Sequence, residues 1–375
     1  MKTRKTHVVS RVDARAIPDE FGEIRLVCKI KNETLRLPYL LRFYREAGID
    51  RFIFIDNGSS DGTVEYLLAQ RDCHVFQTRD SFADSRGGID WLNAVLDLYG
   101  HGHWCVVVDA DELLVFPHCE AVGLKGLCRF LDAEGSEGLY TFMIDMYHDA
   151  AVADAACQPG TPFTEICPLF DTDYSFVRRI NYRRRRLPPF PETEVIGGPR
   201  SRKFAPEQLS TGVLARMKSR LLWEVSRPLY KRGLPKSVQA SPQLLLFKIP
   251  LVKWRRGYAY ESATHVLNRI RLSAVTGALL HFKFFADFYE KIAQAIESGA
   301  YTEGSIHYKK FRAVVGDDRS FSFNYPGSAQ YRSSDDLLRH RLIKTTPLYE
   351  DFAASWSRDQ APVEAHRVHQ LHKSA

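Results

Sequence analysis

The sequence predicts an α/β fold, with a mostly parallel central sheet that helices cover on both faces. Strand-like and helix-like segments alternate four times between residues 24 and 108, and the connections between them are short. This alternation is typical of βαβ units, whose strands lie parallel. Apolar runs such as residues 104–108 lack polar alternation, as expected for strands that are buried on both faces.

Each element of this alternation has its own signal. The first helix carries apolar residues at helical spacing and is followed by Gly48, a residue type that commonly ends helices. The second strand runs into the turn-forming residues 57–60. Two more helices are expected late in the chain, at residues 301–315 and 333–343. The strands expected in the N-terminal half are residues 24–30, 51–55, 74–78 and 104–108, and the helices are residues 34–47, 61–69 and 89–99.

Length and composition exclude several classes of protein. The chain has 375 residues, enough for one large or two modest domains, and its 45% hydrophobic content argues against global disorder. No apolar stretch approaches the ~20 residues that span a bilayer. The basic leader, residues 1–22, lacks the apolar region of a signal peptide. The seven cysteines form no CxxC pair, so we expect buried free thiols and a cytoplasmic location.

The positive charge is concentrated in one segment. Residues 178–236 contain 16 Lys and Arg against 4 Asp and Glu, a net charge of +12 in a chain whose total is +7. Such a segment could contact phosphates, an acidic glycan, anionic lipid or nucleic acid, or could be a solvated face. The Pro-rich stretch after the Arg183–Arg186 run indicates a loop. Attachment to anionic lipid, helped by Trp254, Arg255 and Arg256, would be peripheral and reversible, at the inner face of the membrane.

Polar side chains follow three of the predicted strands. Ligands of a parallel sheet bind beyond the carboxyl ends of its strands, so these side chains are expected to line a site. An acidic edge would repel a nucleoside diphosphate unless a divalent cation lay between them, and carboxylates suit Mg²⁺ or Mn²⁺. In an extended segment Asp109 and Asp111 point to the same side, so one can hold the metal while the other holds it or a ribose hydroxyl. The residues concerned are Asn32 and Glu33 after the first strand, Asp56–Asp61 after the second, and Asp109, Asp111 and Glu112 after the fourth.

Three segments in this order, VCKIKNE, FIDNGSSDGT and VVVDADE, resemble the GT-A nucleotide-sugar glycosyltransferases, specifically a family 2-like group. The resemblance is tight over residues 24–116. A DxD pattern alone is common by chance, whereas the ordered set at strand ends is specific. The resemblance implies a GT-A fold, an inverting reaction, Mn²⁺ or Mg²⁺, and a nucleoside-diphosphate sugar as donor, with a UDP-sugar foremost. It continues more loosely through GGPRSRKF (197–204), FKIPLVKWRRGYAYESATH (247–265) and LLHFKFF (279–285).

The resemblance also implies roles for individual residues. Asp111 would be the principal metal ligand, Asp109 would face the ribose or the metal, and His281 would complete the metal shell. Glu112 resembles the acidic residue that follows the DxD pattern in this group, although it could instead brace the loop. His281 lies in an apolar stretch and could instead be a packed core residue.

The donor and the acceptor have their own candidate residues. Asp56 could alternatively serve only its turn, because Asp favours turns for local reasons. Asn93 is included because the helix at 89–99 could bring it toward the nucleotide. The residues expected at the donor nucleotide are Asn32, Glu33, Asp56, Asn57, Asn93 and Asp109, and those expected at phosphate or acceptor are Lys283, Arg200 and Arg202.

An inverting transfer also needs a carboxylate base within hydrogen-bond reach of the acceptor hydroxyl. The candidates are Asp145, Asp149, Glu192 and Glu194. Asp145 follows the strand-like run YTFMI, which places it near the edge of the sheet, although a strand-end hydrogen bond would explain it equally well. The sequence does not single out the base.

These observations predict a metal-dependent glycosyltransferase of cell-surface or exopolysaccharide synthesis, acting on a saccharide or a lipid-linked acceptor. One alternative is a nucleotidyltransferase of similar fold, although the first strand is not followed by a Gly-rich phosphate loop. The other is a non-catalytic protein that binds nucleic acid or membrane through the Arg-rich segment. The strand-end carboxylates favour the enzyme, and no nucleic-acid partner is expected. Two domains are expected, a GT-A domain at 23–300 and a helical extension with a tail at 301–375. The GT-A domain would have a nucleotide-binding half at 23–117 and an acceptor half that carries a basic loop at 178–236.

Overall fold

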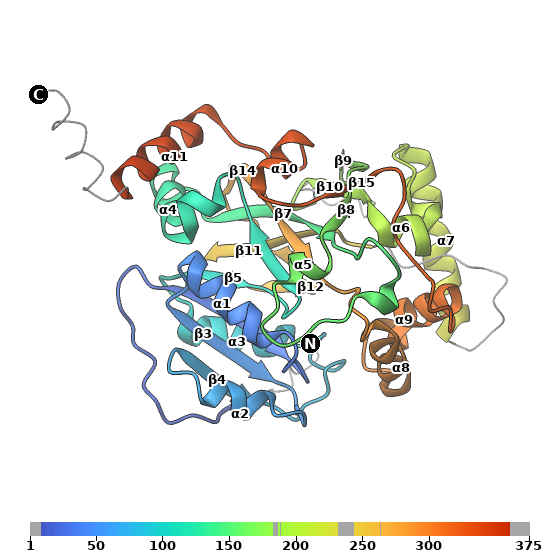
Figure 1. Ribbon diagram of the computed structural model, residues 1–375, viewed down its shortest axis with the longest axis horizontal. Coiled ribbons are helices and arrows are strands. Elements are labelled where there is room, and N and C mark those ends of the chain that lie inside the picture. The colour runs from blue at the N-terminus through green and yellow to red at the C-terminus, as the bar shows by residue number, and fades with distance from the viewer. Residues whose placement is uncertain (1–8, 183–186, 188, 232–243, 263, 361–375) are drawn as a thin grey trace, which may run out of the picture.

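A large β-sheet runs through the centre of the molecule (Figure 1). The computed structural model describes residues 9–182, 187, 189–231, 244–262 and 264–360. In this part of the chain the sheet has nine strands, in the order β1-β4-β3-β2-β5-β11-β7-β14-β6. Their bounds are β1 Ser10–Arg11, β2 Ile24–Ile30, β3 Arg51–Asp56, β4 Cys73–Gln77, β5 Trp104–Val107, β6 Glu112–Val115, β7 Gly138–Asp145, β11 Phe247–Lys253 and β14 Leu272–His281.

The sheet combines two parallel blocks with antiparallel connections. β4, β3, β2 and β5 are parallel to one another, and so are β7 and β14. β11 lies between the blocks, antiparallel to both β5 and β7. β1 and β6 close the two edges as antiparallel strands. The predicted α/β class with flanking helices is therefore confirmed, while the antiparallel strand at its centre comes from residues that the sequence analysis does not assign to the sheet.

Helices cover both faces of the sheet (Figure 1). The first helix begins at Leu37, later than predicted, with Pro38 in its first turn, a position that proline favours. The second late helix is shorter than predicted and ends before Arg341, whose φ of 56° is not helical. The helix bounds are α1 Leu37–Ala47, α2 Thr63–Leu68, α3 Ile89–Tyr99, α4 Cys119–Glu134, α5 Phe163–Ile166, α6 Gly198–Phe204, α7 Val213–Lys231, α8 Phe288–Ser298, α9 Thr302–Val315, α10 Ser334–Arg339 and α11 Pro347–Gln360.

Alternate residues of the central strands belong to different hydrophobic clusters. On β2, Leu26 and Cys28 pack in the cluster that contains α1 and α4, whereas Val27 packs in the cluster that contains α3. Successive side chains of a strand point to opposite faces, so an uninterrupted apolar run is what a doubly covered strand needs. The expected burial of the strands on both faces is confirmed.

The C-terminal helices pack on the rest of the chain. Phe311 of α9 lies 5.6 Å from Phe288 of α8, measured between ring centroids. Tyr349 of α11 contacts Phe130 of α4, with ring centroids 4.9 Å apart. These contacts cross the predicted boundary at residue 300, so the extension is attached to the main body at two separate places.

The basic segment at 178–236 is more ordered than the predicted loop. β10 (Thr193–Gly197) pairs with β9 (Tyr174–Arg178) as an antiparallel hairpin, and the helices α6 and α7 follow. The Arg183–Arg186 run lies outside the described residues. The prediction of a loop was wrong for residues 213–231, which form α7. It rested on the charges of the segment and did not use the helical spacing of its apolar residues.

Two predictions from composition can be compared directly with the structure. All seven cysteines lie in the described part of the chain and are free thiols; five are buried as expected, whereas Cys119 and Cys157 are half-buried. Burial raises the pKa of Cys105 to about 12, which keeps this thiol protonated. In the same part of the chain, each helix is too short or too polar to cross a bilayer.

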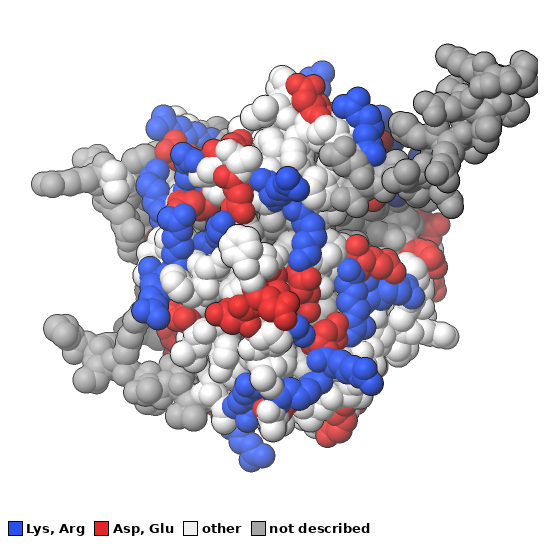
Figure 2. All heavy atoms as spheres, turned by 90° about the vertical axis from the view of Figure 1, so that its left-hand side faces the viewer, with Lys and Arg blue, Asp and Glu red and all other residues white. Residues whose placement is uncertain are grey.

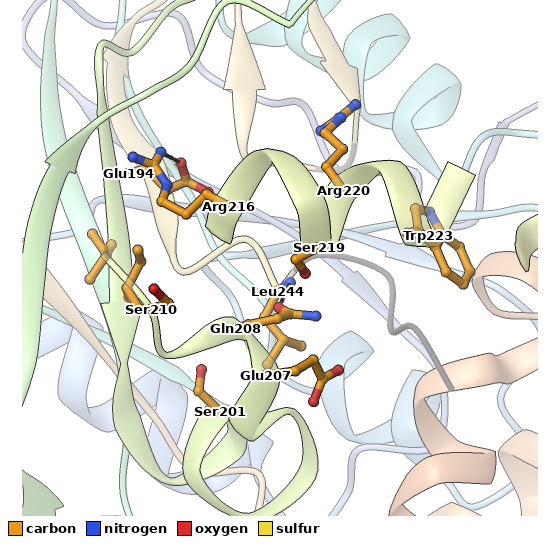
Figure 3. Close-up of a pocket in the computed structure, with 12 residues that line it drawn as sticks. Glu194, Ser201, Glu207, Gln208, Ser210, Arg216, Ser219, Arg220, Trp223 and Leu244 are labelled. Carbon is orange, nitrogen blue, oxygen red and sulfur yellow. Dashed lines mark hydrogen bonds and ion pairs between the residues drawn. The ribbon is translucent and has the colours of Figure 1, made fainter. Parts of the chain in front are cut away.

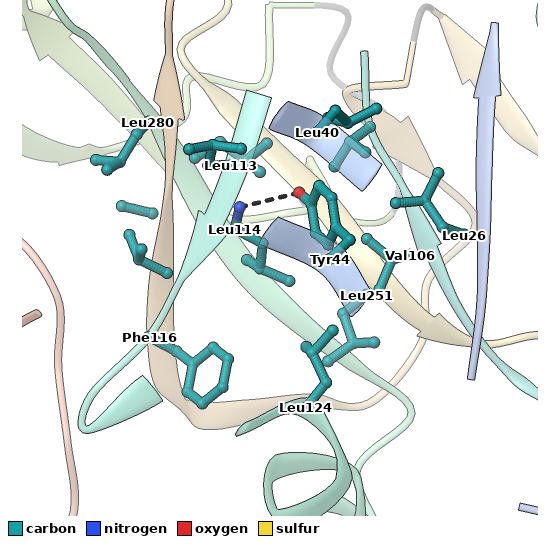
Figure 4. Packing of buried hydrophobic residues seen from close by; sticks show 14 of the residues in the cluster. Leu26, Leu40, Tyr44, Val106, Leu113, Leu114, Phe116, Leu124, Leu251 and Leu280 are labelled. Carbon is teal, nitrogen blue, oxygen red and sulfur yellow. Dashed lines mark hydrogen bonds between the residues drawn. The ribbon is translucent and has the colours of Figure 1, made fainter. Parts of the chain in front are cut away.

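Tyr44 of α1 fixes the edge strand β6. Its hydroxyl donates to the carbonyl oxygen of Glu112 and accepts from the N–H of Leu114, both at 3.0 Å (Figure 4). Tyr44 is fully buried. Because β6 is the last strand of the sheet, its outward N–H groups have no further strand to pair with, and the tyrosine replaces that partner.

We expect Tyr44→Phe to lower the free energy of unfolding by about 1–3 kcal/mol, because it leaves the buried N–H of Leu114 without an acceptor. Denaturant titration measures the change. The control is Tyr174→Phe, which removes a buried hydroxyl that has no hydrogen-bond partner among the described residues. Equal costs for the two variants would show that Tyr44 does not hold β6.

Candidate active site

The carboxyl ends of the central strands meet at one edge of the sheet. The parallel register pairs Ile30 with Asp56 on β2 and β3, and Asp145 with His281 on β7 and β14. The antiparallel strand β6 begins at the same level, where Glu112 pairs with His281. We call the side chains gathered here the acidic edge: Asp109, Asp111, Glu112, Asp145, His281 and Lys248.

His281 lies between two carboxylates. Its Nδ1 is 2.6 Å from Oδ1 of Asp145 and its Nε2 is 3.4 Å from Oδ2 of Asp111. Burial alone would lower the pKa of His281, but the charges of Asp111 and Asp145 outweigh it, and the pKa is raised. Burial would likewise raise the pKa of Asp111, yet the charge and hydrogen bond of His281 hold it well below its usual range. The buried histidine therefore has a specific electrostatic environment and is not simply a core residue.

Asp145 is buried and fully engaged. Its exposed fraction is 1%, and its second oxygen accepts a hydrogen bond from Nε of Arg200 at 2.7 Å. Burial would raise the pKa of Asp145, but the charge of Arg200 and the hydrogen bond from His281 lower it. These contacts fix the ring of His281 so that Nε2 points toward Asp111. The strand-end hydrogen bond considered for Asp145 is thus present, which favours a positioning role over that of a base.

Lys248 of β11 neutralises the other two carboxylates. Its ammonium group lies 2.6 Å from Oε2 of Glu112 and 3.2 Å from Oδ2 of Asp109, and the lysine and Glu112 are both almost completely buried. Burial lowers the pKa of Lys248, but Asp109 and Glu112 more than offset this and raise it above its usual range. Glu112 also accepts a hydrogen bond from the N–H of Asp109 at 2.9 Å, so it braces the turn that carries Asp109 and Asp111.

The donor set of the acidic edge is suited to a divalent cation that also binds a substrate. No group of three or more His, Cys, Asp or Glu side chains within the described residues is arranged to hold a metal ion alone. Asp111 is 20% exposed and faces Nε2 of His281, whose Nδ1 is fixed by Asp145, as is common for metal-binding histidines. Mg²⁺ is typically held by one or two protein ligands together with substrate phosphates. Asp111 and His281 therefore fit a shared metal site. Asp109 contacts Lys248 through Oδ2 and stays 44% exposed, and its contact with the metal or the ribose stays a prediction.

The predicted donor residues at the ends of β2 and β3 form a compact turn region. The side-chain oxygen of Asn32 accepts from the N–H of Ser60 at 2.8 Å, and Asn32 has a φ of 56°. The carboxylate of Glu33 faces Lys291 of α8 at 3.2 Å. The amide of Asn57 donates to the carbonyl oxygens of Thr78 and Asp80. These contacts fix the loops, while their contact with a nucleotide stays a prediction.

Asp56, which was expected at the donor nucleotide, is buried and holds its own turn together. It has no exposed surface, and its carboxylate accepts hydrogen bonds from the N–H groups of Gly58 and Ser59 and from Nε2 of Gln77. The turn-forming role of Asp56 is therefore present. Its contact with the donor nucleotide stays a prediction.

Two other predicted donor-site residues hold neighbouring elements. The side-chain amide of Asn93 on α3 accepts a hydrogen bond from the N–H of Tyr260 at 2.9 Å and donates one to its carbonyl oxygen at 3.0 Å. Asn93 therefore connects α3 to β12 (Tyr260–Ser262). Lys283 follows β14 and donates to the hydroxyl of Tyr308 at 3.2 Å. The charge of nearby Asp111 contributes to raising the pKa of Lys283 against the effect of burial. Lys283 is thus close to the acidic edge, and Asn93 serves the packing of the fold.

The remaining candidates lie on the β10 hairpin and α6. Glu194 is buried in an ion pair with Arg216 of α7, and Glu192 is half exposed, 3.8 Å from Arg269. Arg202 pairs with Asp171 at 2.9 Å and stacks over the ring of Tyr325. Its guanidinium is therefore held by the protein. Asp149 is 69% exposed and lies beside His148.

Sequence reasoning missed two cationic residues that organise the site. Lys248 neutralises two carboxylates. Arg36 makes a bidentate hydrogen-bonded ion pair with Asp287, at 2.8 and 2.9 Å, which joins the start of α1 to the start of α8. Arg36 is 1% exposed. The signal for Lys248 was its place among apolar residues in FKIPLV, because a lysine in a buried strand needs a partner of opposite charge.

No protein-family model and no curated protein matches the chain. A protein from Bacillus anthracis described as a glucose-1-phosphate thymidylyltransferase, solved with sucrose, is 8% identical, with a TM-score of 0.24 and a match covering 88% of this chain and 98% of that one. A UDP-glucose pyrophosphorylase from Acinetobacter baumanii is 10% identical, with a TM-score of 0.24 and 93% and 98% covered. A 4-diphosphocytidyl-2C-methyl-D-erythritol synthase is 14% identical, with a TM-score of 0.22. That match covers 34% of this chain and 63% of the synthase. At such TM-scores we draw no functional argument from these neighbours.

We expect Lys248→Met to lower the free energy of unfolding by about 3–5 kcal/mol, because it leaves the carboxylate of Glu112 buried without its cation. Denaturant titration with circular dichroism measures this cost. The matched control is Lys253→Met on the same strand. It breaks an ion pair with Asp132 in which the lysine side chain is 33% exposed. That change is expected to cost less than about 1 kcal/mol. A cost for Lys248→Met as small as that of the control would contradict the assigned role of Lys248.

Proposed function

We propose that the chain is a metal-dependent glycosyltransferase that moves a sugar from a nucleoside-diphosphate donor to a hydroxyl of a saccharide or lipid-linked acceptor. The observation that carries this proposal is the Asp145–His281–Asp111 arrangement at the carboxyl ends of β7 and β14. A parallel sheet binds ligands at this edge, and an acidic edge needs a cation to bind a diphosphate. The GT-A resemblance of the DxD segment supports the choice of a sugar nucleotide, with a UDP-sugar as the first donor to test.

The residues of the acidic edge have distinct tasks in this proposal. Asp111 and Nε2 of His281 would hold the cation, and Asp145 would keep the imidazole ring in its orientation. Lys248 keeps Asp109 and Glu112 in place, so that the turn carrying Asp111 does not collapse onto the site. When bound, a divalent cation would stabilise the charge that develops on the leaving diphosphate.

Arg200 is suited to the phosphates of the donor. Its Nε is fixed by Asp145, and its Nη2 is buried with no hydrogen-bond partner among the described residues. A buried donor without an acceptor is costly, and a phosphate oxygen would satisfy it. Arg202, in contrast, is held by Asp171, so we assign the predicted phosphate contact to Arg200 and not to Arg202.

The choice of base follows from exposure. Asp145 and Glu194 are each buried in contact with an arginine, so neither is free to accept a proton from an acceptor. Asp149 and Glu192 are exposed at 69% and 50%. We therefore propose that the base, if it is one of the predicted carboxylates, is Asp149 or Glu192.

We expect Asp111→Asn to abolish Mn²⁺-dependent binding of UDP while the ligand-free protein stays folded. Its melting temperature should fall, because the charge interaction between Asp111 and His281 is lost. Isothermal titration calorimetry and differential scanning fluorimetry measure the two quantities. The control is Asp335→Asn on α10, where the carboxylate is 67% exposed.

The wild type is further expected to release a nucleoside diphosphate from a nucleotide sugar. Release of pyrophosphate from a nucleoside triphosphate and a sugar phosphate would identify a nucleotidyltransferase instead. Mn²⁺-dependent UDP binding that survives Asp111→Asn would show that the metal site lies elsewhere.

A second substitution separates a positioning role of Asp145 from a role as base. If Asp145 orients His281, Asp145→Asn should weaken Mn²⁺ affinity about 10–100-fold, as loss of an outer-shell partner of a metal ligand commonly does. A base, by contrast, would affect turnover alone. Mn²⁺ titration in the presence of UDP, followed by electron paramagnetic resonance, measures the affinity. Unchanged affinity together with lost turnover would restore Asp145 as the base.

A further inference from the structure

The helix α7 exposes most of its apolar side chains. It lies at the margin of the molecule beside α6 (Figure 1), and its side chains are described for residues 213–227. Leu214 is 83% exposed, Leu221 65% and Val225 60%. The exposed apolar residues of the helix are Val213, Leu214, Met217, Leu221, Leu222 and Val225.

The polar side of α7 faces the body of the protein. Arg216 forms its buried ion pair with Glu194 of β10, and Ser219 and Trp223 face the same pocket (Figure 3). Ser226 is also buried. At about 100° per residue these positions fall on one side of the helix, and the six exposed apolar residues cover the other side, about half of its circumference. A surface helix of a water-soluble protein has the reverse orientation, with its apolar side toward the core.

The charges around this apolar face are mostly positive. Arg216 is buried on the other side of the helix, so the charged residues between 213 and 227 that are at least partly exposed are three basic ones and one acidic one, Glu224. Lys218 and Glu224 lie within the apolar arc, and Arg220 and Arg227 lie on one border of it, where Arg220 pairs with Glu224 at 3.6 Å. The distant face of the molecule differs, because there Lys and Arg are interspersed with Asp and Glu (Figure 2). The exposed charge of α7 is therefore net positive next to its apolar side chains.

We propose that α7 lies flat in the surface of an anionic membrane, with Leu214, Met217 and Leu221 inserted among the acyl chains and the basic residues at the phosphate groups. A strongly amphipathic helix with Lys and Arg beside its apolar face binds membranes in this way. The attachment goes beyond the proposed catalysis and does not depend on it.

The anchor inferred here differs from the one suggested by the sequence alone. Trp254 was expected to help membrane attachment, but it is fully buried and donates to Asp97 at 3.0 Å. That expectation was wrong because Trp254, which directly follows β11, packs in a buried hydrophobic cluster. We therefore place the proposed membrane contact on α7 and not on residues 254–256.

Co-sedimentation of the full chain with vesicles tests this inference. The wild type should bind vesicles of phosphatidylcholine mixed with phosphatidylglycerol, bind phosphatidylcholine alone much more weakly, and dissociate as salt is raised. The double variant Leu214→Ser/Leu221→Ser should bind the anionic vesicles about tenfold or more weakly, because it removes the inserted apolar surface. Melting temperatures establish that both proteins are folded.

The matched control is Leu98→Ser/Leu348→Ser, which changes two leucines exposed at 73% and 63% on α3 and α11. It should bind the anionic vesicles as the wild type does. Failure of the wild type to bind them, equal binding to neutral vesicles, or equal losses in the two double variants would overturn the proposal. So would a dimer in analytical ultracentrifugation that Leu214→Ser/Leu221→Ser converts to monomer, because a second copy would then cover α7.

Discussion

The acidic edge depends on the compensation of buried negative charge. Four carboxylates meet where the central strands end, and two of them, Asp145 and Glu112, are almost completely buried. A buried carboxylate is costly unless a cation and hydrogen bonds reach it. Lys248 and Arg200 supply cations, and His281 joins two of the carboxylates. Each of these three comes from a segment distant in sequence, so the site exists only when the whole sheet is assembled.

This compensation leaves one part of the site open. Lys248 satisfies Glu112 and contacts one oxygen of Asp109, whose side chain stays 44% exposed, and Asp111 is 20% exposed with His281 as its neighbour. The open part of the site therefore includes Asp109 as well as the Asp111–His281 pair. A site with two protein ligands is incomplete by itself, which would make metal binding and diphosphate binding support each other. Such mutual dependence would suit the proposed glycosyltransferase, which would have to release a nucleoside diphosphate after each turnover.

The sequence predicted the parts of the structure that depend on local patterns. The alternation of strand and helix placed Asp56 and Asp109 at strand ends because those signals lie within a few residues of each other. It could not predict the pairing of Lys248 with Glu112, which are 136 residues apart and meet through the antiparallel strand β11. The exposure of Asp56 was also beyond it, because the same residue types form a turn and bind ligands. The structure adds a hydrogen bond that the local pattern does not contain, from Gln77 of the neighbouring strand to the carboxylate of Asp56.

The most direct test of the central claim is the position of a bound cation. Crystals grown with UDP and Mn²⁺ and measured at the manganese absorption edge would show it as an anomalous peak. If Asp111 and His281 hold the cation, one peak should lie between Oδ2 of Asp111 and Nε2 of His281, with diphosphate oxygens completing its coordination and Lys248 still paired with Glu112. A peak at any other site, or UDP bound with Nε2 of His281 still facing Asp111 and no cation between them, would contradict it.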